Sequence, residues 1–561
     1  MKQHGARWLL IGLVGTVGSI VLVAMIDRPA TAEVPEVKAE VEGDIDMGEV
    51  RKHLDVLTGY ETRLTGSVGE QGSREYIVRQ LRLLGAVEIT QQEFTVAVPV
   101  RRRGEVVGVI GGREVRVPVY PLWPNLARTC QTPPGGLRGR LVYGGKGSDA
   151  ELRGLRLEGS LVVLDWDSDL GWLNVPEFGG QGVIFRGERA ATRTLAQRKF
   201  LTVPADIPRY YVGQEDVGML DALVASGAEV RVECEVAWER VSAMNIIGKI
   251  SEGEMGRGGR VIDRTPVFFS AYYDSISVVP DRAPGAEQAC SAAILLELAR
   301  QLRKVRGPRP VYVLFTSGHG QAMAGMTHFV EAVRAGKCVR PGLVVSLDFS
   351  SGSDAYGVFA LGFFRPQIEI YVAPRYGTLG HKLTELVRRM AREGNDSPAR
   401  FVDGINNTSG RSWWTYFPYI VTFESELGTV AGIPSVTIAT VSDSRSYVDT
   451  PDDRRERICE RRLARQVTTC EGKQAGLVTL ATALVQWRGS FVNRGIEDTW
   501  SMVGGRVVWL DQERDYVPNQ PLVDGMVFIK QRQSSKYFCG TRGIPALMTD
   551  SNGYYRLGGL R

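Results

Sequence analysis

The chain has 561 residues, of which 43% are hydrophobic and 23% are charged. This length exceeds one ordinary core, so we expect two to four domains of soluble globular composition. The formal net charge of +5 arises from interleaved acids and bases, which argues against a nucleic-acid-binding protein.

The N-terminus has the features of an export signal. Lys2 and Arg7 flank the start of an apolar run over 8–26, which as a helix would be about 28 Å long and could cross a bilayer. The small residues 30–32 then resemble a cleavage site. Residues 1–32 therefore predict a signal peptide or an uncleaved membrane anchor. In both cases the rest of the chain is extracytoplasmic, either membrane-anchored or secreted.

After an acidic linker, hydrophobic spacing predicts helices over 47–57 and 73–84, and alternation predicts a strand over 87–98. Short glycine-rich strands fill 99–238. Strands and helices then alternate as far as a helix over 473–487. This order predicts an α/β fold with a mostly parallel mixed sheet sandwiched by helices.

The C-terminal part differs from this core. Residues 488–504 have the composition of a linker, and 505–561 have a strand-only pattern with turn residues between the strands. We therefore expect a C-terminal β-sandwich.

The seven cysteines include no C-x-x-C pair, so a cysteine zinc site is not expected. Cys459 and Cys470 are close enough in sequence to pair in an oxidising compartment. Cys290 and Cys338 are expected to be buried thiols.

Five segments of the core resemble motifs of the di-zinc peptidases, a family that includes bacterial leucyl aminopeptidases, glutamate carboxypeptidase, the transferrin receptor ectodomain and glutaminyl cyclase. The segments are SAYYDS (270–275), PGAEQACSAAILLELAR (284–300), VLFTSGHGQAMAGMTHFV (313–330), SLDF (346–349) and GIPSVTIATVSDSRSYVDTPDD (432–453). They occur in the family's order, which implies the zinc aminopeptidase fold.

The resemblance extends to the other parts of the chain. Residues 99–238 resemble a protease-associated domain inserted into the core, which then comprises 33–98 and 239–487. Residues 505–561 resemble the start of a carboxypeptidase regulatory-like β-sandwich, which we expect to be incomplete at this length.

In this family two metal ions share a bridging carboxylate, and each also takes a His and a further carboxylate. By position, the resemblance implies that Glu287 replaces the bridging Asp and Asp449 replaces the final His ligand, whereas the ligand Asp348 and the supporting Asp274 are retained. His319 stands where the family has its general-base Glu. These are the candidate site residues.

Two ligand positions carry unsuitable residues: Tyr272 replaces a His, and Gly320 replaces a Glu. The chain has five histidines in all, and none falls on either expected His position. Zinc sites need about three protein ligands each. The resemblance therefore implies a degenerate metal centre and no cofactor, the alternative being zinc or another divalent cation.

The four acids leave two readings open. Together they could hold a hard cation such as Ca²⁺ or Mg²⁺. Alternatively, they could pair with nearby arginines such as Arg282, Arg411 and Arg445, and we prefer this second interpretation.

An aromatic loop at 413–417 could bind peptide or sugar, or it could pack as the core of a loop.

We therefore expect an exported zinc-aminopeptidase-like protein of the metallopeptidase family, catalytically inactive and acting as a binding or scaffold ectodomain. The alternative is a divergent metal-dependent aminopeptidase or amidohydrolase with a carboxylate-rich site. A peptide or protein ligand fits both. No nucleic-acid partner is expected, and membrane contact would come through the N-terminal segment if it is uncleaved.

Overall fold

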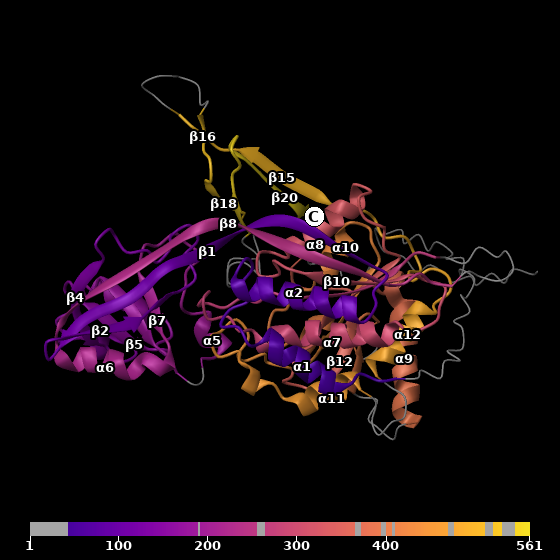
Figure 1. Ribbon diagram of the computed structural model, residues 1–561, viewed down its shortest axis with the longest axis horizontal. Coiled ribbons are helices and arrows are strands. Elements are labelled where there is room, and N and C mark those ends of the chain that lie inside the picture. Colours follow the sequence, from indigo (N-terminus) through magenta and orange to yellow (C-terminus); the bar gives the residue numbers. More distant parts are fainter. Residues whose placement is uncertain are drawn as a thin grey trace, which may run out of the picture. The chain divides into compact units, whose positions relative to one another are not determined.

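The computed structural model describes most of the chain after the N-terminal segment (Figure 1). The described residues are 43–188, 191–254, 264–364, 372–393, 400–406, 410–468, 476–510, 520–529 and 545–560. The expected signal or anchor at 1–32 lies outside them, and so does Cys470. Among the helices within these ranges, none is both long and apolar enough to span a bilayer.

A mixed sheet forms the centre of the core, in the strand order β13-β12-β14-β11-β9-β10-β8. Four neighbours in the middle, β14, β11, β9 and β10, are parallel, whereas β12 and β8 run antiparallel to them. The bounds are β8 Glu229–Ser251, β9 Val267–Tyr272, β10 Val311–Thr316, β11 Leu343–Asp348, β12 Tyr356–Phe359, β13 Phe401–Asp403 and β14 Ser435–Thr440. Strands β11 and β14 are buried along their whole length, as expected for strands covered on both faces.

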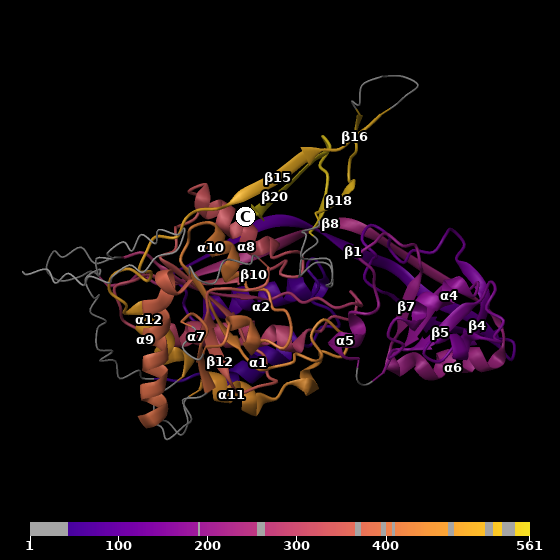
Figure 2. The same ribbon diagram turned by 180° about the vertical axis from the view of Figure 1, so that it is seen from behind.

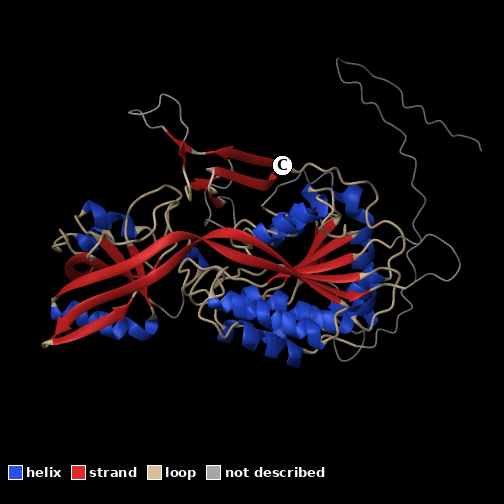
Figure 3. Ribbon diagram, turned by 45° about the horizontal axis from the view of Figure 1, so that its top comes forward, coloured by secondary structure: helices blue, strands red, loops and turns tan. Residues whose placement is uncertain are grey.

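Helices cover both faces of this sheet (Figure 3). Helix α7 lies directly on β9 and is buried almost all round, since every residue except Arg300 is buried. The bounds are α1 Met47–Leu57, α2 Val68–Leu83, α7 Ala286–Leu302, α8 Ala324–Arg334, α9 Val372–Glu393, α10 Ser425–Val430, α11 Glu460–Val467 and α12 Leu477–Val485. The expected α/β fold with a mixed sheet between helices is confirmed.

Helix α2 begins five residues earlier than its hydrophobic spacing predicts. The Ser67 side chain accepts a hydrogen bond from the Glu70 backbone N–H at 3.2 Å and caps the helix. This cap offsets the low helix propensity of Gly69 and Gly72 in the first turns.

The region expected as an insert is joined to the core by two long strands. Strand β1 (Glu88–Ile110) pairs antiparallel with β8 from Glu88↔Lys249 to Val107↔Arg231, with one irregularity near Arg101. The expected boundaries at 99 and 238 therefore fall inside continuous strands. The remaining elements of this region are β2 Arg113–Pro118, β3 Tyr120–Pro121, α3 Asp149–Leu152, β4 Leu137–Tyr143, β5 Leu161–Asp165, α4 Asn174–Glu177, β6 Gly182–Arg186, α5 Arg193–Ala196, β7 Arg209–Val212 and α6 Val217–Ser226.

The described C-terminal residues form three two-stranded antiparallel pairs, β15–β20, β16–β17 and β18–β19. The bounds are β15 Ser501–Arg506, β16 Val508–Trp509, β17 Gln520–Pro521, β18 Met526–Phe528, β19 Ala546–Met548 and β20 Tyr554–Leu560. They supply the strand-only pattern predicted for this part of the chain.

Candidate functional site

The candidate residues gather at one edge of the core sheet. Tyr272 and Asp348 are the last residues of β9 and β11, and His319 follows β10 by three residues. Glu287 is the second residue of α7, and Asp449 lies in the loop after β14. Because parallel strands end at the same edge of a sheet, the fold brings these positions together, as it does in α/β proteins generally.

Asp348 is paired with an arginine of the core. The Arg445 Nη1 donates to Asp348 Oδ1 at 2.8 Å, and its Nη2 donates to the Asp348 main-chain oxygen at 3.0 Å. Both side chains are at least nine-tenths buried. Burial opposes the charged guanidinium, but Asp348, Tyr272 and Asp443 together outweigh it and raise the pKa of Arg445. Of the three arginines expected near the acids, this one pairs with a candidate ligand.

Asp449 is paired with an arginine that the sequence did not suggest. Arg193 belongs to α5 in the inserted region, and its Nε donates to Asp449 Oδ2 at 3.1 Å. Arg193 is 1% exposed and Asp449 is 3% exposed. The Arg193 backbone N–H also donates to the Ser446 carbonyl at 2.6 Å, which fixes α5 on the loop that carries Asp449.

Arg282 and Arg411 play no such role. Arg282 forms ion pairs with Glu215 and Glu61, and Arg411 is exposed and forms no ion pair with a described residue. Arg193 was not predicted because it lies 256 positions from its partner in the sequence. No local sequence signal marks such a contact.

Glu287 and Asp274 are held by neutral donors. Glu287 accepts hydrogen bonds from the backbone N–H and the hydroxyl of Ser351, both at 2.6 Å. Burial raises the pKa of Glu287 to about 7, and the Ser351 hydrogen bonds only partly offset it. Asp274 accepts from the Thr65 hydroxyl at 2.9 Å and the Gly318 backbone at 3.1 Å. Burial raises its pKa to about 6.

His319 lies against the tyrosine that replaces a ligand. The rings of Tyr272 and His319 are stacked, with centroids 3.9 Å apart and planes inclined by 16°. The His319 Nδ1 lies 3.5 Å from Glu424 Oε1, a distance at the limit of a hydrogen bond. Burial opposes a charged imidazole, but Glu424, Asp274 and Asp348 together raise the pKa of His319.

Glu424 is a site residue that sequence reasoning missed. It is 3% exposed, precedes α10, and accepts a hydrogen bond from the Thr316 hydroxyl at 2.6 Å. The segment TFESELG also contains Glu426, and nothing local in the sequence distinguishes the two acids, because the role of Glu424 depends on how the chain packs.

The aromatic loop at 413–417 divides its two tryptophans. Trp413 packs against Phe363 and Phe417 with ring centroids 4.8 and 6.3 Å away, whereas Trp414 is 54% exposed. The first therefore belongs to a packed loop core, and the second stands on the surface.

These residues do not fit a zinc centre. Among the described residues there is no group of three or more His, Cys, Asp or Glu side chains arranged to hold a metal ion. At Gly320 even a Cβ atom would lie 2.9 Å from Ile276 Cδ1, so the space for a ligand side chain is filled. The Asp348 and Asp449 carboxylates already have guanidinium partners. Fewer than the roughly three ligands that zinc needs remain for either ion.

Residues 245–388 match the sequence profile described as peptidase family M28, which supports the family suggested by the motifs. A zinc aminopeptidase from Bacillus subtilis is 17% identical, with 79% of this chain and 94% of that one covered and a TM-score of 0.46. An aminopeptidase from Aneurinibacillus sp. strain AM-1 is 16% identical, with 81% and 97% covered and a TM-score of 0.41. A glutaminyl cyclase from Fimbriiglobus ruber is 13% identical, with 82% and 100% covered and a TM-score of 0.38. No curated protein sequence matched the chain.

Proposed function

With the match of residues 245–388 to peptidase family M28 as its premise, we propose that this chain is an exported, catalytically inactive member of the zinc-aminopeptidase type. It acts as a binding or scaffold ectodomain for a peptide or protein ligand. One observation carries the proposal: the two carboxylates at ligand positions, Asp348 and Asp449, each have a buried arginine in place of a metal ion.

A guanidinium supplies a single positive charge without the chemistry of a metal ion. It neutralises a buried carboxylate through directed hydrogen bonds. It has no open coordination position and cannot lower the pKa of a bound water as zinc does. Arg445 and Arg193 therefore stabilise Asp348 and Asp449 as buried structural acids, and neither arginine can activate a water molecule as a zinc ion does.

Displacing these arginines by metal ions is unfavourable. Breaking a buried ion pair by removing one partner costs about 3–5 kcal/mol, and a metal ion would also leave the released guanidinium buried and unpaired. Gly320 adds no ligand in return.

The general-base position supports the same conclusion. His319 is stacked on Tyr272 and faces Glu424, so protein groups hold its imidazole in place. Proton chemistry at this position would differ from that of a Glu.

The alternative is a divergent metal-dependent aminopeptidase or amidohydrolase. Glu287 and Asp274 favour it, because their described hydrogen-bond partners are neutral and their carboxylates could serve a hard cation. They are two acids only, and both are buried.

Metal content and hydrolysis separate the two functions. Purified full-length protein is equilibrated with Zn²⁺, Co²⁺, Mn²⁺, Mg²⁺ or Ca²⁺, its bound metal is measured by mass spectrometry, and aminoacyl anilides are supplied as substrates. We expect less than stoichiometric metal and no turnover. Metal-dependent turnover that both Asp348→Asn and His319→Ala abolish would establish the alternative.

Export rests on the N-terminal sequence. Protease added to intact cells or spheroplasts is expected to reach the core, because Lys2, Arg7 and the apolar run over 8–26 direct it outward. Full protection of the core, with normal digestion after lysis, would reject export and leave the question of catalysis untouched.

A further inference from the structure

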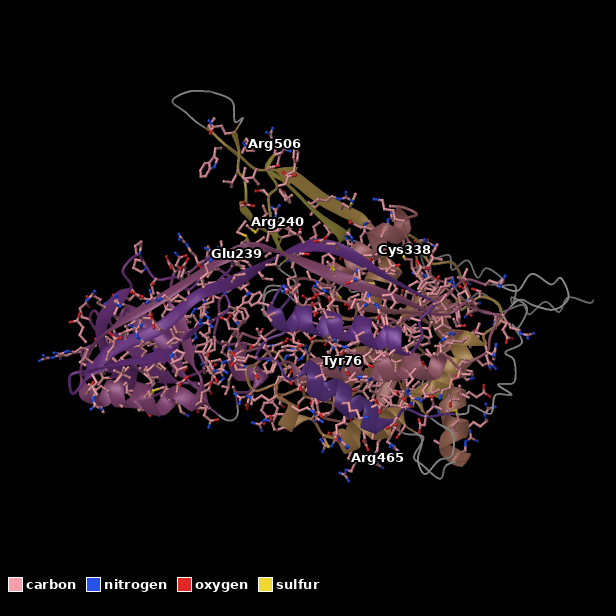
Figure 4. The ribbon with its side chains drawn as sticks, viewed as in Figure 1. Tyr76, Glu239, Arg240, Cys338, Arg465 and Arg506 are labelled. Atoms are coloured by element: carbon pink, nitrogen blue, oxygen red, sulfur yellow. The ribbon has the colours of Figure 1, made fainter. Side chains whose placement is uncertain are left out.

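Helix α11 presents a row of arginines to solvent. Arg461, Arg462 and Arg465 are exposed, whereas Leu463, Gln466 and Val467 are buried against the core. Figure 4 shows Arg465 at the periphery of the core with its side chain directed away from the ribbon. The helix therefore has one buried side and one cationic side.

Further arginines continue this surface. Arg388, Arg389 and Arg392 are exposed on the last turns of α9, and Arg400 donates to the Arg465 main-chain oxygen at 3.5 Å. Helices α9 and α11 both lie at the periphery of the core when it is seen from behind (Figure 2). We call the following residues the arginine face: Arg388, Arg389, Arg392, Arg400, Arg461, Arg462 and Arg465.

Part of this charge has no acidic partner among the described residues. Arg465 pairs with Asp354 at 3.0 Å, whereas Arg388, Arg389 and Arg461 form no ion pair with a described residue. All the cations of the face are guanidinium groups, whose planar fork matches the oxygens of a phosphate in a bidentate way. The chemistry of the face therefore favours phosphate groups.

The arginine face lies beside the point where the N-terminal segment joins the core. A Cβ atom on Gly476 would lie 2.6 Å from the Val467 carbonyl, at the end of α11, and 2.7 Å from Asp44 Oδ1. The start of the described chain and the end of α11 are therefore neighbours. An ion pair between Arg51 of α1 and Glu460 of α11, at 2.6 Å, holds the two helices together.

This position matters because of the length of chain that precedes it. The apolar run over 8–26 is separated from the core by residues 27–43, which reach at most about 60 Å when fully extended. The described chain begins beside the end of α11, so a run held in a bilayer, as the proposed export leaves open, would tether the core through this point. It then keeps the arginine face close to the membrane surface at high effective concentration.

We infer that the arginine face docks on the phosphate headgroups of an anionic phospholipid membrane, with the N-terminal segment as its tether. Charge complementarity drives the docking, and the attraction falls off within a Debye length, about 8 Å at physiological ionic strength. This inference rests on the proposed export and is independent of the proposed lack of catalysis. The competing partner for the arginine face is the acidic stretch over 33–42 of the same chain, whose net charge is negative.

Arginine-specific footprinting of the full-length protein tests the docking. The chain is reconstituted in vesicles of phosphatidylcholine alone or with about one third phosphatidylglycerol. Its arginines are modified with phenylglyoxal and located by mass spectrometry. In the anionic vesicles we expect modification of Arg461 and Arg389 to fall at least threefold, and about 0.5 M salt to restore it. Arg113, exposed in the inserted region, is expected to react equally in both.

If Arg461 and Arg389 are modified much less than Arg113 in both kinds of vesicle, the inference is overturned and the arginine face is assigned to the acidic stretch. If Arg461 and Arg389 react as readily as Arg113 in both kinds of vesicle, the inference is overturned as well. A protein that is nevertheless metal-free and inactive would leave the proposed function standing.

A matched pair of variants separates docking from overall charge. Arg461→Glu with Arg462→Glu should abolish the protection of Arg389. Arg153→Glu with Arg156→Glu, at exposed positions of the inserted region, changes the net charge equally and should leave that protection intact. Loss of protection in both pairs would contradict a specific face. Circular dichroism of each variant checks that the core is folded.

Discussion

The two carboxylates at metal-ligand positions are neutralised by arginines of different origin. Arg445 comes from the core, from the same loop region as Asp449, and gives Asp348 two hydrogen bonds. Arg193 comes from the inserted region and gives Asp449 one. The first pair therefore belongs to the core alone, whereas the second also fixes the inserted region to the core.

The surroundings of the two guanidinium groups differ as well. Arg193 has buried Nη1 and Nη2 atoms without hydrogen-bond partners among the described residues, and its plane lies over the Tyr419 ring at 5.3 Å. Unsatisfied buried donors carry a desolvation cost. The core pair should therefore contribute more to stability than the pair formed by the insert.

The largest expected effect is that of Arg445→Met. The substitution leaves Asp348 buried without its cation, so the free energy of unfolding should fall by about 3–5 kcal/mol. Urea denaturation followed by circular dichroism measures it. Adding Asp348→Leu should recover most of the loss, because an apolar pair of similar size is tolerated in place of a buried ion pair. A loss below about 1 kcal/mol for the single variant would contradict this role.

A second effect concerns Glu287, a buried carboxylate whose hydrogen-bond donors from Ser351 are neutral. The folded-state pKa of Glu287 is raised to about 7, whereas an unfolded Glu titrates near 4.3. Between these values the native protein binds more protons than the unfolded chain, so stability falls as pH rises through this window.

We expect Glu287 to contribute a decline of about 2–3 kcal/mol between pH 4.5 and 7. Urea unfolding at several pH values measures it, and Glu287→Gln should flatten the curve because an amide does not titrate. Identical pH profiles for wild type and Glu287→Gln would show that Glu287 is ionised throughout.

Arg193→Met should cost less than Arg445→Met, about 2 kcal/mol, because the orphaned donors disappear with the guanidinium. Its distinctive signature is local. Hydrogen exchange should accelerate in 191–200 and in the loop that carries Ser446, since the contact between them is lost. Arg153→Met, at an exposed position of the same region, is the matched control. A uniform acceleration over the whole chain would instead indicate global destabilisation.

The sequence predicted the parts of the site that depend on strand order. Asp348 and Tyr272 end parallel strands, so periodicity and motif order placed them at one edge. It named Arg445 among possible partners because that residue lies in the same motif as Asp449. Arg193 and Glu424 could not be predicted, since their contacts depend on how a distant domain and a neighbouring helix pack. The start of the helix predicted over 73–84 was wrong, because Ser67 caps the helix and extends it toward the N-terminus.

The smallest expected effect concerns the position where a metal ligand is missing altogether. At Gly320 an added Cβ would lie 2.9 Å from Ile276 Cδ1 and 3.0 Å from its Cβ, and Ile276 is 2% exposed. Gly320→Ala should therefore cost about 1 kcal/mol through overpacking, measured by urea denaturation. The double variant Gly320→Ala, Ile276→Val removes the methyl group at Cδ1, so it should cost less than the sum of its single changes, a coupling that the double-mutant cycle isolates. Additive losses would mean that Ile276 does not fill the space. If the coupling is present, this isoleucine has closed the position of one ligand, as the guanidinium groups have closed those of two others, and restoring a glutamate at 320 alone would not rebuild a metal site.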